Sequence, residues 1–332
     1  MSTEKPMISV IIPHRTSETI DATLLALESA ARHARESGHP EAARYEVLAV
    51  SGNQPSVQRN TAVRQASGEF VYFLDNDSVP ATDCLMRVAN FFSIHSDAAI
   101  LGGPSLTPES DNTSQKAFGH VLGSFAGTAF IRARYSSFGV LRETTDRELI
   151  LCNLAMRRQT FLDLGGFDER LYPNEENALM DKALQEGWTL WHDPLLRVWR
   201  SQRTNFRAFI RQLFGYGRGR AEQMRLAPLV SNIVPFIFML FPLAMLLLVP
   251  SLMILPDLVW CWLTYPLATF LASIPSLAAG PVVAGKAWLA FFLCHLCYGC
   301  GLWAGLFLPL RSRTVVASVQ CRKIAAPKAG RR

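Results

Sequence analysis

Two aspartates separated by one residue, Asp75 and Asp77, directly follow the apolar run Val71-Tyr72-Phe73-Leu74. Carboxylates at this spacing can share a hard divalent cation such as Mg²⁺, which combines a few protein carboxylates with substrate phosphate oxygens. The same residues, together with Asn76 and Ser78, also favour an ordinary turn. The pattern alone therefore leaves a turn and a metal site both open.

A second pair of acids, Glu175-Glu176, follows Pro173-Asn174 and opens a predicted helix that ends at Gly187. Asn174 is a favourable N-cap residue, and acidic side chains in the first turn complement the helix dipole. A carboxylate there can also act as a general base, although a helix N-terminus favours its ionised, less basic form. Dipole complementation and catalysis both remain open.

The elements that must position these acids alternate between strand and helix patterns. Strands are predicted at 7–13, at 45–50 and up to residue 74, and apolar residues at helical spacing separate them. This alternation predicts an α/β fold with a mostly parallel sheet flanked by helices, whose strands open at their carboxyl ends on one crevice. The loops expected there are Pro13-His14-Arg15, Ser51-Gly52-Asn53 and Asp75-Asn76-Asp77.

Two common nucleotide-binding motifs are missing from this region. No Gly-x-Gly-x-x-Gly follows the first strand, and no Gly-x-x-x-x-Gly-Lys-Ser/Thr occurs. A dinucleotide-dependent oxidoreductase and a P-loop enzyme are therefore disfavoured. Phosphate charge would instead be met by a cation on Asp75 and Asp77, together with Arg59.

The carboxyl-terminal third has the composition of a membrane region. Between residues 227 and 310 the only formally charged side chains are Asp257 and Lys286. Three apolar stretches, 229–255, 258–279 and 287–310, are long enough to cross a bilayer, and prolines should kink the first. Cys294, Cys297 and Cys300 lie in the third, where small residues at a helix interface explain them better than a metal cluster.

Basic residues flank the apolar region on both sides. Seven arginines and one acid lie between residues 200 and 225, and seven lysines or arginines and no acid follow residue 310. Beside membrane spans, this charge predicts contact with anionic lipid headgroups rather than with nucleic acid. Residues 207–220 have the pattern of an amphipathic helix in the membrane interface, which would place Arg218 and Arg220 within reach of a phosphorylated lipid.

The predicted membrane topology contains a conflict between the number of apolar stretches and the expected location of the two ends of the chain. No cleavable signal precedes the first strand, and seven cysteines form no disulfide-like framework, so the catalytic region is expected in the cytosol. A cytosolic basic tail then requires an even number of crossings, whereas three apolar stretches are present. One of them would have to be re-entrant or interfacial, or the proline-rich first stretch would have to fold back.

Together these residues resemble a known family. The run 7–13, Arg59-Asn60 with residues 66–77, and Gly165-Gly166-Phe167-Asp168-Glu169 followed by 174–176 look like the family 2 glycosyltransferases with a GT-A fold. Residues 174–176 and 212–220, with apolar spans behind them, look most like the membrane-anchored branch that builds bacterial exopolysaccharides, such as succinoglycan glucosyltransferases. The resemblance covers roughly residues 7–222.

The resemblance implies a role for each matching position. Glu176 stands where the family places its catalytic base, with Glu175 beside it, and Asp77 would hold Mg²⁺ or Mn²⁺ with help from Asp75. The nucleotide-sugar donor, expected to be a UDP-sugar, would contact residues from the loops and the helix that follows the second strand: Pro13, His14, Arg15, Ser51, Gly52, Arg59, Asn60, Asp75 and Asn76. A lipid-phosphate acceptor would meet Gln212, Arg218 and Arg220.

Three departures from the family pattern carry information. Ser51-Gly52 replaces the usual Asp-Asp, which bears on recognition of uracil, and His14-Arg15 replaces an aromatic residue and Asn. Gln212-Leu-Phe-Gly-Tyr216 lacks the Arg-Trp of the Gln-x-x-Arg-Trp motif found in processive synthases, which favours adding one sugar.

The sequence therefore predicts an inverting glycosyltransferase that transfers one sugar from a nucleotide sugar to a lipid-linked acceptor. It would be a multi-pass protein of the inner or plasma membrane with a cytosolic GT-A domain (1–200), basic interfacial helices (201–226), a transmembrane region (227–310) and a basic tail (311–332). A catalytically degenerate, nucleotide-sugar-binding membrane scaffold is the main alternative, and a nucleotidyltransferase on a related fold is the third.

Overall fold

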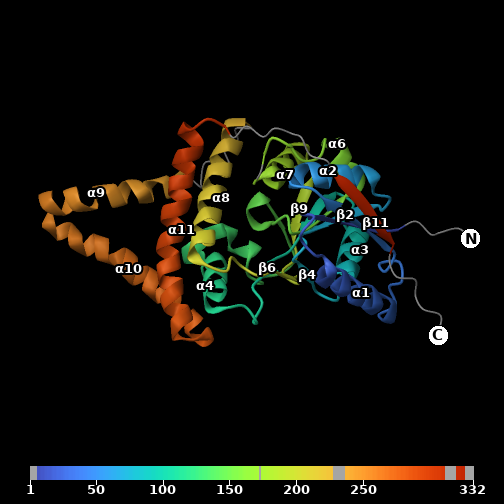
Figure 1. Ribbon diagram of the computed structural model, residues 1–332, viewed down its shortest axis with the longest axis horizontal. Helices are drawn as coiled ribbons and strands as arrows, with labels where there is room; N and C mark the ends of the chain where they lie inside the picture. Colours follow the sequence, from blue (N-terminus) through green and yellow to red (C-terminus); the bar gives the residue numbers. More distant parts are fainter. Residues whose placement is uncertain (1–5, 172, 227–235, 311–318, 326–332) are drawn as a thin grey trace, which may run out of the picture. The chain divides into compact units, whose positions relative to one another are not determined.

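The computed structural model describes residues 6–171, 173–226, 236–310 and 319–325, and the chain divides into two compact units (Figure 1). Unit 1 takes residues 1–106, 133–200 and 314–332, and unit 2 takes residues 107–132 and 201–313. Each unit is built from segments that are far apart in the sequence.

Unit 1 contains an eight-stranded sheet, a small three-stranded sheet and five α-helices among its described residues. Its strands are β1 (Ile8–His14), β2 (Tyr45–Ser51), β3 (Phe70–Leu74), β4 (Val79–Pro80), β5 (Ala98–Gly102), β6 (Ser105–Leu106), β7 (Arg142–Thr144), β8 (Asn153–Arg157), β9 (Thr189–His192), β10 (Val198–Trp199) and β11 (Gln320–Ala325). Its helices are α1 (Asp21–Glu36), α2 (Pro55–Gln65), α3 (Cys84–Ile94), α6 (Arg158–Asp163) and α7 (Glu175–Gln185), with a 3₁₀ turn η2 (Asp146–Glu148).

The large sheet has the strand order β11-β2-β1-β3-β8-β5-β9-β7. β1 pairs in parallel with both β2 and β3, whereas β8 runs antiparallel between β3 and β5. The parallel pairs require the crossover helices α1 and α2, which the alternating pattern predicted. The expected mostly parallel α/β sheet flanked by helices is thus confirmed, and the loops after β1, β2 and β3 leave the same edge.

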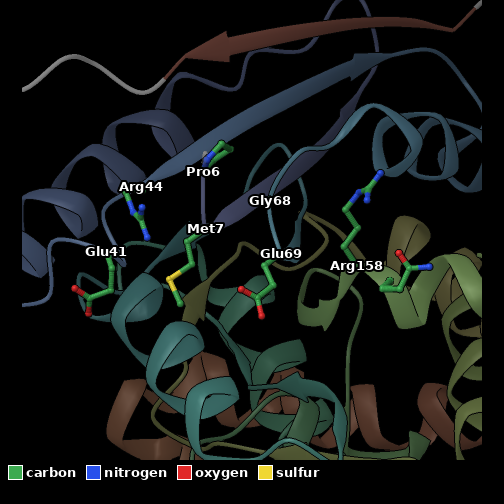
Figure 2. Close-up of a pocket in the computed structure, with 8 residues that line it drawn as sticks. Pro6, Met7, Glu41, Arg44, Gly68, Glu69 and Arg158 are labelled. Carbon is green, nitrogen blue, oxygen red and sulfur yellow. The ribbon is translucent and has the colours of Figure 1, made fainter. Parts of the chain in front are cut away.

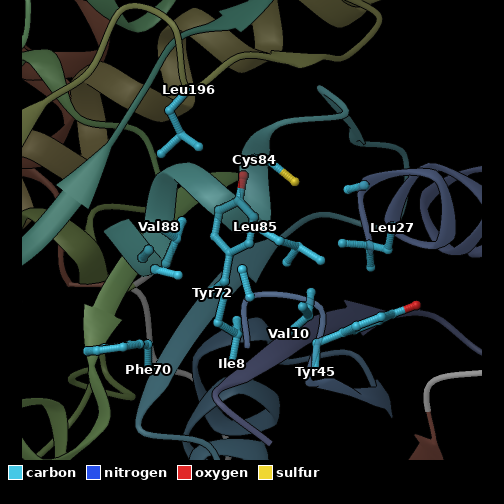
Figure 3. Close-up of a cluster of buried hydrophobic side chains, with 14 of the residues drawn as sticks. Ile8, Val10, Leu27, Tyr45, Phe70, Tyr72, Cys84, Leu85, Val88 and Leu196 are labelled. Atoms are coloured by element: carbon cyan, nitrogen blue, oxygen red, sulfur yellow. The ribbon is translucent and has the colours of Figure 1, made fainter. Parts of the chain in front are cut away.

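Alternation of side chains along the central strands divides the core into two layers. Val10, Val47 and Tyr72 face α1 and α3, and Figure 3 shows Tyr72 in this cluster with Leu85 and Val88. The intervening residues of the same strands, such as Ile11, Leu48 and Phe73, face α2, α6 and α7. Both faces of the sheet are therefore covered, which explains why β3 consists entirely of buried residues.

A small sheet of two-residue strands lies beside the end of β3. β10 pairs antiparallel with β4, with Trp199 opposite Val79, and parallel with β6. Continuing this register by one residue brings Arg200 opposite Ser78, next to Asp77. Neither β4 nor β10 is long enough to show a periodic pattern, so this pairing was not predicted from the sequence.

The edge of the large sheet is formed by a strand from the end of the chain. β11 pairs antiparallel with β2, from Gln320 opposite Ser51 to Ala325 opposite Glu46, and Figure 1 shows it in red beside the blue strand β2. Lys323 forms an ion pair with Glu46 and donates a hydrogen bond to Ser67 Oγ at 2.9 Å. The region predicted only as a basic tail therefore supplies a strand of unit 1.

Unit 2 is helical in its described residues. It contains α4 (Thr113–Leu122), α5 (Phe125–Thr128), α8 (Phe206–Leu226), α9 (Leu240–Ile254), α10 (Val259–Ser273) and α11 (Pro281–Phe307), with the 3₁₀ turns η4 (Pro256–Leu258) and η5 (Ile274–Ala279). A further 3₁₀ turn, η1 (Ala129–Arg134), begins in unit 2 and ends in unit 1.

Three helical stretches among the described residues are long and apolar enough to cross a membrane: Phe236–Ile254, Pro256–Ala279 and Pro281–Phe307. They correspond to the three predicted apolar stretches, although residues 229–235 of the first lie outside the described residues. Pro250 lies within α9, as expected for the proline-rich first stretch.

Glycines bring α8 and α11 into close contact. A Cβ on Gly217 would collide with the carbonyl oxygen of Tyr298, and one on Gly301 would collide with that of Phe214. Small residues at such crossings let helix backbones approach closely. The predicted amphipathic helix 207–220 is therefore observed as the longer α8, with one face packed on α11.

Candidate active site

The loops after β1 and β2 are tied together by one buried side chain. His14 lies opposite Ser51 in the sheet register, and Gly52 N donates to His14 O at 3.1 Å. Gln58, which is 2 % exposed, donates from Nε2 to His14 O at 3.0 Å and to Val50 O at 2.5 Å. Sequence reasoning missed Gln58, because a helical glutamine carries no local sign of such a distant contact.

Five residues predicted to bind the donor meet at this edge of the sheet. Pro13 is buried, His14, Ser51 and Gly52 are partly exposed, and Arg15 is fully on the surface. The Arg15 backbone N–H donates to Glu18 at 2.9 Å, which shapes the loop after β1. Two loops that are far apart in the sequence therefore lie side by side at this edge of the sheet.

The acid pair follows β3 on a loop whose backbone is fixed from α1. Thr23 Oγ1 donates to Asn76 O at 3.0 Å and to Ser78 O at 2.7 Å, and Ser78 N donates to Asp75 O at 3.1 Å. The turn that Asp, Asn and Ser favour is thus present. It does not exclude a cation site, because the Asp77 side chain remains 48 % exposed.

A guanidinium group bridges the two aspartates. Arg200 donates from Nε to Asp77 Oδ1 at 2.6 Å and approaches Asp75 Oδ2 with Nη2 at 3.2 Å. Both carboxylates therefore point toward one positive group. No sequence pattern indicates this contact, because Arg200 is simply one of the seven arginines between residues 200 and 225.

Arg59 connects the acid pair to the second pair of acids. Its side chain is 6 % exposed, and it reaches Asp75 Oδ1 from Nη2 at 2.9 Å and Glu175 Oε1 from Nη1 at 3.2 Å. Its Nε is buried without a hydrogen-bond partner among the described residues. The acids predicted from two separate motifs are thus joined through one buried arginine.

The two glutamates at the start of α7 differ in environment. Glu175 is 1 % exposed, whereas Glu176 is partly exposed. Burial raises the pKa of Glu175 to about 8, the nearby charge of Glu176 adds to this rise, and Arg59 opposes it. Glu175 is therefore less acidic than an exposed carboxyl, and its burial keeps it from an acceptor in solution.

Asn174 does not cap α7 as predicted. It adopts a left-handed conformation, with φ at 98°, and its side chain makes no capping hydrogen bond. Its Oδ1 accepts instead from Asn177 Nδ2 at 2.8 Å, and Asn177 Oδ1 accepts from Arg134 Nη2 at 2.7 Å. Asn is chosen here because it tolerates a positive φ, which turns the chain sharply before Glu175.

Asn60, which was predicted to bind the donor, is hydrogen-bonded to the turn that precedes α7. Its Nδ2 donates to Phe167 O at 2.9 Å and to Glu169 Oε1 at 3.0 Å, and its Oδ1 accepts from Phe167 N at 2.9 Å. The structure therefore places Asn60 as the support of the turn that precedes α7.

The residues predicted to meet a lipid phosphate lie on α8 in unit 2. Gln212 donates to Tyr216 at 2.8 Å, and Arg218 donates to Glu222 at 2.8 Å and to Pro309 O at 3.1 Å. Arg220 is 5 % exposed. On this helix the exposed basic side chains are instead Arg207, Arg211 and Arg225.

The acid pair has the chemistry required for a divalent cation. The described residues contain no group of three or more His, Cys, Asp or Glu side chains that could hold a metal. Mg²⁺ and Mn²⁺ accept as few as one or two protein carboxylates when substrate phosphates supply further oxygens. The bridging of both carboxylates by Arg200 shows that they converge on one cation, so Asp75 and Asp77 fit such an ion.

A separate pocket of about 570 Å³ lies at the other end of the sheet (Figure 2). Its lining includes Met7, Arg44, Glu69 and Arg158, which precede β1, β2 and β3 or follow β8. These positions are at the amino ends of the parallel strands, opposite the acid pair. This pocket is therefore not the place where the predicted catalytic residues meet.

Comparison with known proteins identifies the family. The model of glycosyl transferase family group 2 matches residues 70–304. The chain belongs to this family. As a family 2 glycosyltransferase, it transfers a sugar from a nucleotide sugar.

Individual relatives of this glycosyltransferase are distant. The succinoglycan biosynthesis protein ExoA of Rhizobium meliloti is 24 % identical over 260 residues, covering 76 % of this chain and 74 % of ExoA. The pre-mycofactocin glycosyltransferase of Mycobacterium tuberculosis is 25 % identical over 167 residues, covering 50 % of this chain and 34 % of that protein.

Among solved structures, the mannosyltransferase PcManGT from Pyrobaculum calidifontis, in complex with GDP-Man and Mn²⁺, has a TM-score of 0.52 and 16 % identity. The match covers 92 % of this chain and 88 % of PcManGT. The family 2 glycosyltransferase described above therefore has the GT-A type of fold that its sequence predicted.

Proposed function

We propose that this glycosyltransferase transfers a single sugar, with inversion, from a nucleotide-diphosphate sugar to a lipid-linked acceptor at the cytosolic face of a bacterial-type inner membrane. The observation that carries the proposal is the buried Arg59, which joins Asp75 of the first acid pair to Glu175 of the second at the carboxyl edge of the sheet. Open α/β sheets bind ligands at that edge.

The donor would lie across the loops after β1, β2 and β3. His14 and Ser51 are adjacent in the register and would face the nucleoside, and Gln58 would keep their two loops at a fixed separation. Asp75 and Asp77 would hold Mg²⁺ or Mn²⁺ beside the diphosphate. When bound, such an ion supplies a Lewis acid that stabilises the charge of the leaving group.

Glu176 is the proposed general base. Displacement at an anomeric carbon passes through a transition state with oxocarbenium character, and the acceptor hydroxyl must lose a proton as it attacks. Glu176 is partly exposed in the first turn of α7, whereas Glu175 is buried and bound to Arg59. Glu175 would therefore position Arg59, and one base opposite the diphosphate would give inversion.

The acceptor is inferred from the helices of unit 2. Three helical stretches suited to a membrane and a basic α8 support a lipid-linked acceptor, with exposed Arg207 and Arg211 available to headgroups. ExoA is named for succinoglycan biosynthesis, which supports a role in exopolysaccharide or cell-surface glycan assembly. The absence of Arg-Trp after Gln212 supports transfer of one sugar.

A direct test is to incubate membranes containing the full chain with a panel of radiolabelled UDP- and GDP-sugars and to count label in the lipid extract. Asp77→Ala should abolish transfer, and Glu176→Gln should lower kcat by at least about 100-fold with little change in donor affinity. Glu186→Gln, at the exposed end of the same helix, is the matched control.

Two results would redirect the assignment. Full activity in Asp77→Ala would remove the metal from the mechanism, and full activity in Glu176→Gln would move the base to Glu175 or elsewhere. Nucleotide-sugar binding without transfer to any lipid would favour the alternative of a membrane scaffold, which the departures at His14 and Ser51-Gly52 first suggested.

A further inference from the structure

Arg200 and Arg59 contact the same aspartate but are held differently. Arg59 is almost fully buried and is divided between Asp75 and Glu175. Arg200 is 25 % exposed, and both of its described ion pairs are with the acid pair. Arg59 is thus a fixed part of the core, whereas Arg200 approaches from the open side.

The small sheet determines where Arg200 can reach. The backbone N–H of Arg200 donates to Leu106 O at 2.9 Å, directly after the residues by which β10 pairs with β6. The backbone is therefore fixed, while the long side chain carries the guanidinium to Asp77. A rotation about side-chain bonds would be enough to move this charge without disturbing the strand.

Charge balance indicates what a divalent ion would need. The two aspartates carry −2, and the two arginines that contact them carry +2, so these four side chains balance one another. Adding a divalent ion alone would leave an excess of +2 at a partly buried site, which is costly. The diphosphate of a donor carries about −2 and would restore neutrality.

We propose that Arg200 is the resident counter-cation of the acid pair, and that it moves to the donor diphosphate when a divalent ion occupies Asp75 and Asp77. This proposal rests on the proposed metal and donor site. Its consequence is that metal and nucleotide bind together, because the ion alone must displace an arginine that bridges both carboxylates. Arg200 is then a positioning residue whose role can be measured without turnover.

The test measures free Mn²⁺ by electron paramagnetic resonance during titration of the purified full chain in nanodiscs, with and without UDP or GDP. In the wild type, Mn²⁺ should bind weakly alone and at least about tenfold more tightly with the nucleotide. Arg200→Gln should tighten Mn²⁺ binding in the absence of nucleotide by about tenfold, because a competing positive charge is removed. Arg197→Gln, directly before the short strand β10, is the control.

The outcomes separate this proposal from the proposed function. Unchanged or weaker nucleotide-free Mn²⁺ binding in Arg200→Gln overturns the role of Arg200. Arg200→Lys keeps the charge but loses the contact with both carboxylates, so its nucleotide-free Mn²⁺ affinity should lie between those of the wild type and Arg200→Gln. A folded Arg200→Lys variant with wild-type Mn²⁺ affinity also counts against the proposal. If Asp77→Asn leaves Mn²⁺ binding intact, the metal site itself is wrong.

A separate observation concerns the membrane region. Unit 1 contains both the strands before residue 200 and β11, so the chain leaves this unit and returns to it. Since one unit cannot lie on both sides of a membrane, we infer that residues 201–319 cross it an even number of times.

The three candidate helices differ in how far unit 2 covers them. Within each stretch, the fraction of the most apolar 18 residues that is buried inside the protein is 0 % for Phe236–Ile254, 12 % for Pro256–Ala279 and 44 % for Pro281–Phe307. The first two are consecutive and leave most of their surface for lipid. They form the crossing hairpin, and α11, packed on α8, is the helix that does not cross.

Reporter fusions test this topology. Alkaline phosphatase fused after Asp257 should be active outside the cytosol, whereas fusions after Gly280 and after the last residue should be inactive. An active fusion at the last residue overturns the even number of crossings, and an active fusion after Gly280 overturns the choice of hairpin.

The strand pairing itself can be tested by cross-linking. Val50→Cys should form a disulfide with Cys321, its register partner, detectable in tryptic peptides by mass spectrometry. Ala49→Cys points to the other face and is the control. Failure of Val50→Cys to cross-link in the oxidised full chain contradicts the return of the chain to unit 1.

Discussion

Glu175→Gln should change how the stability of the protein depends on pH. The folded state raises the pKa of this carboxyl from 4.5 to about 8, chiefly through burial. A group with a raised pKa keeps its proton in the folded chain while the unfolded chain has already lost it. The wild type therefore loses stability as pH rises from about 4.5 to about 8. Glutamine cannot ionise and removes this contribution.

The size of the effect follows from a difference of one proton. Between the two pKa values, stability falls by about 1.4 kcal/mol for each pH unit. A domain of 150–250 residues changes its melting temperature by about 2–4 °C per kcal/mol. From pH 5.5 to 7.5, the melting temperature of Glu175→Gln should thus rise relative to the wild type by about 5–10 °C.

Intrinsic-fluorescence melting of the full chain in detergent, at several pH values, measures this difference. Glu186→Gln is the matched control, since Glu186 lies at the end of the same helix with its side chain 46 % exposed. It should melt in parallel with the wild type at every pH. A Glu175→Gln difference that stays constant from pH 5.5 to 7.5 would show that Glu175 is ionised in the folded state and would refute the argument.

Three further substitutions test the structure elsewhere. Gln58→Ala should raise the KM for the donor about 10-fold by releasing the loops after β1 and β2, while Gln65→Ala, exposed on the same helix, leaves it unchanged. Gly217→Ala should lower the melting temperature in detergent, because its Cβ meets a carbonyl of α11; Gly215→Ala, which has open space, should be neutral or stabilising by up to about 1 kcal/mol. Asn153→Leu should cost about 3 kcal/mol in an unfolding assay, since its buried amide satisfies one hydroxyl and two carbonyls; a loss below 1 kcal/mol would contradict the described contacts.

Much of the fold could be predicted because its signals are local. The runs that became β1, β2 and β3 are apolar and β-branched or aromatic, and helices directly follow β1 and β2 along the chain. Because strands and helices alternate along the chain, these strands are expected to pair in parallel and to end at the same edge of the sheet. The position of Asp75 and Asp77 at that edge follows from the same reasoning.

What could not be predicted depends on contacts between distant residues. Arg200 reaches the acid pair through the two-residue strands β4 and β10, which are too short for any period to show. Residues 320–325, Gln-Cys-Arg-Lys-Ile-Ala, read as a basic tail, and only the exposed edge of β2 makes them a strand. Asn174 was misread because a residue suited to capping is equally suited to a positive φ.

The position of β11 also determines when the edge of the large sheet can be completed during synthesis of the chain. Ser51 and Gln320 are separated by 269 residues, so at about 5–20 residues per second the ribosome needs roughly 15–50 s to supply the partner of β2. Throughout that interval the apolar helices are being made while the edge of β2 is unpaired. An open strand edge invites pairing with other chains. Removing the last residues would therefore leave an aggregation-prone nascent sheet rather than a protein that merely lacks a tail.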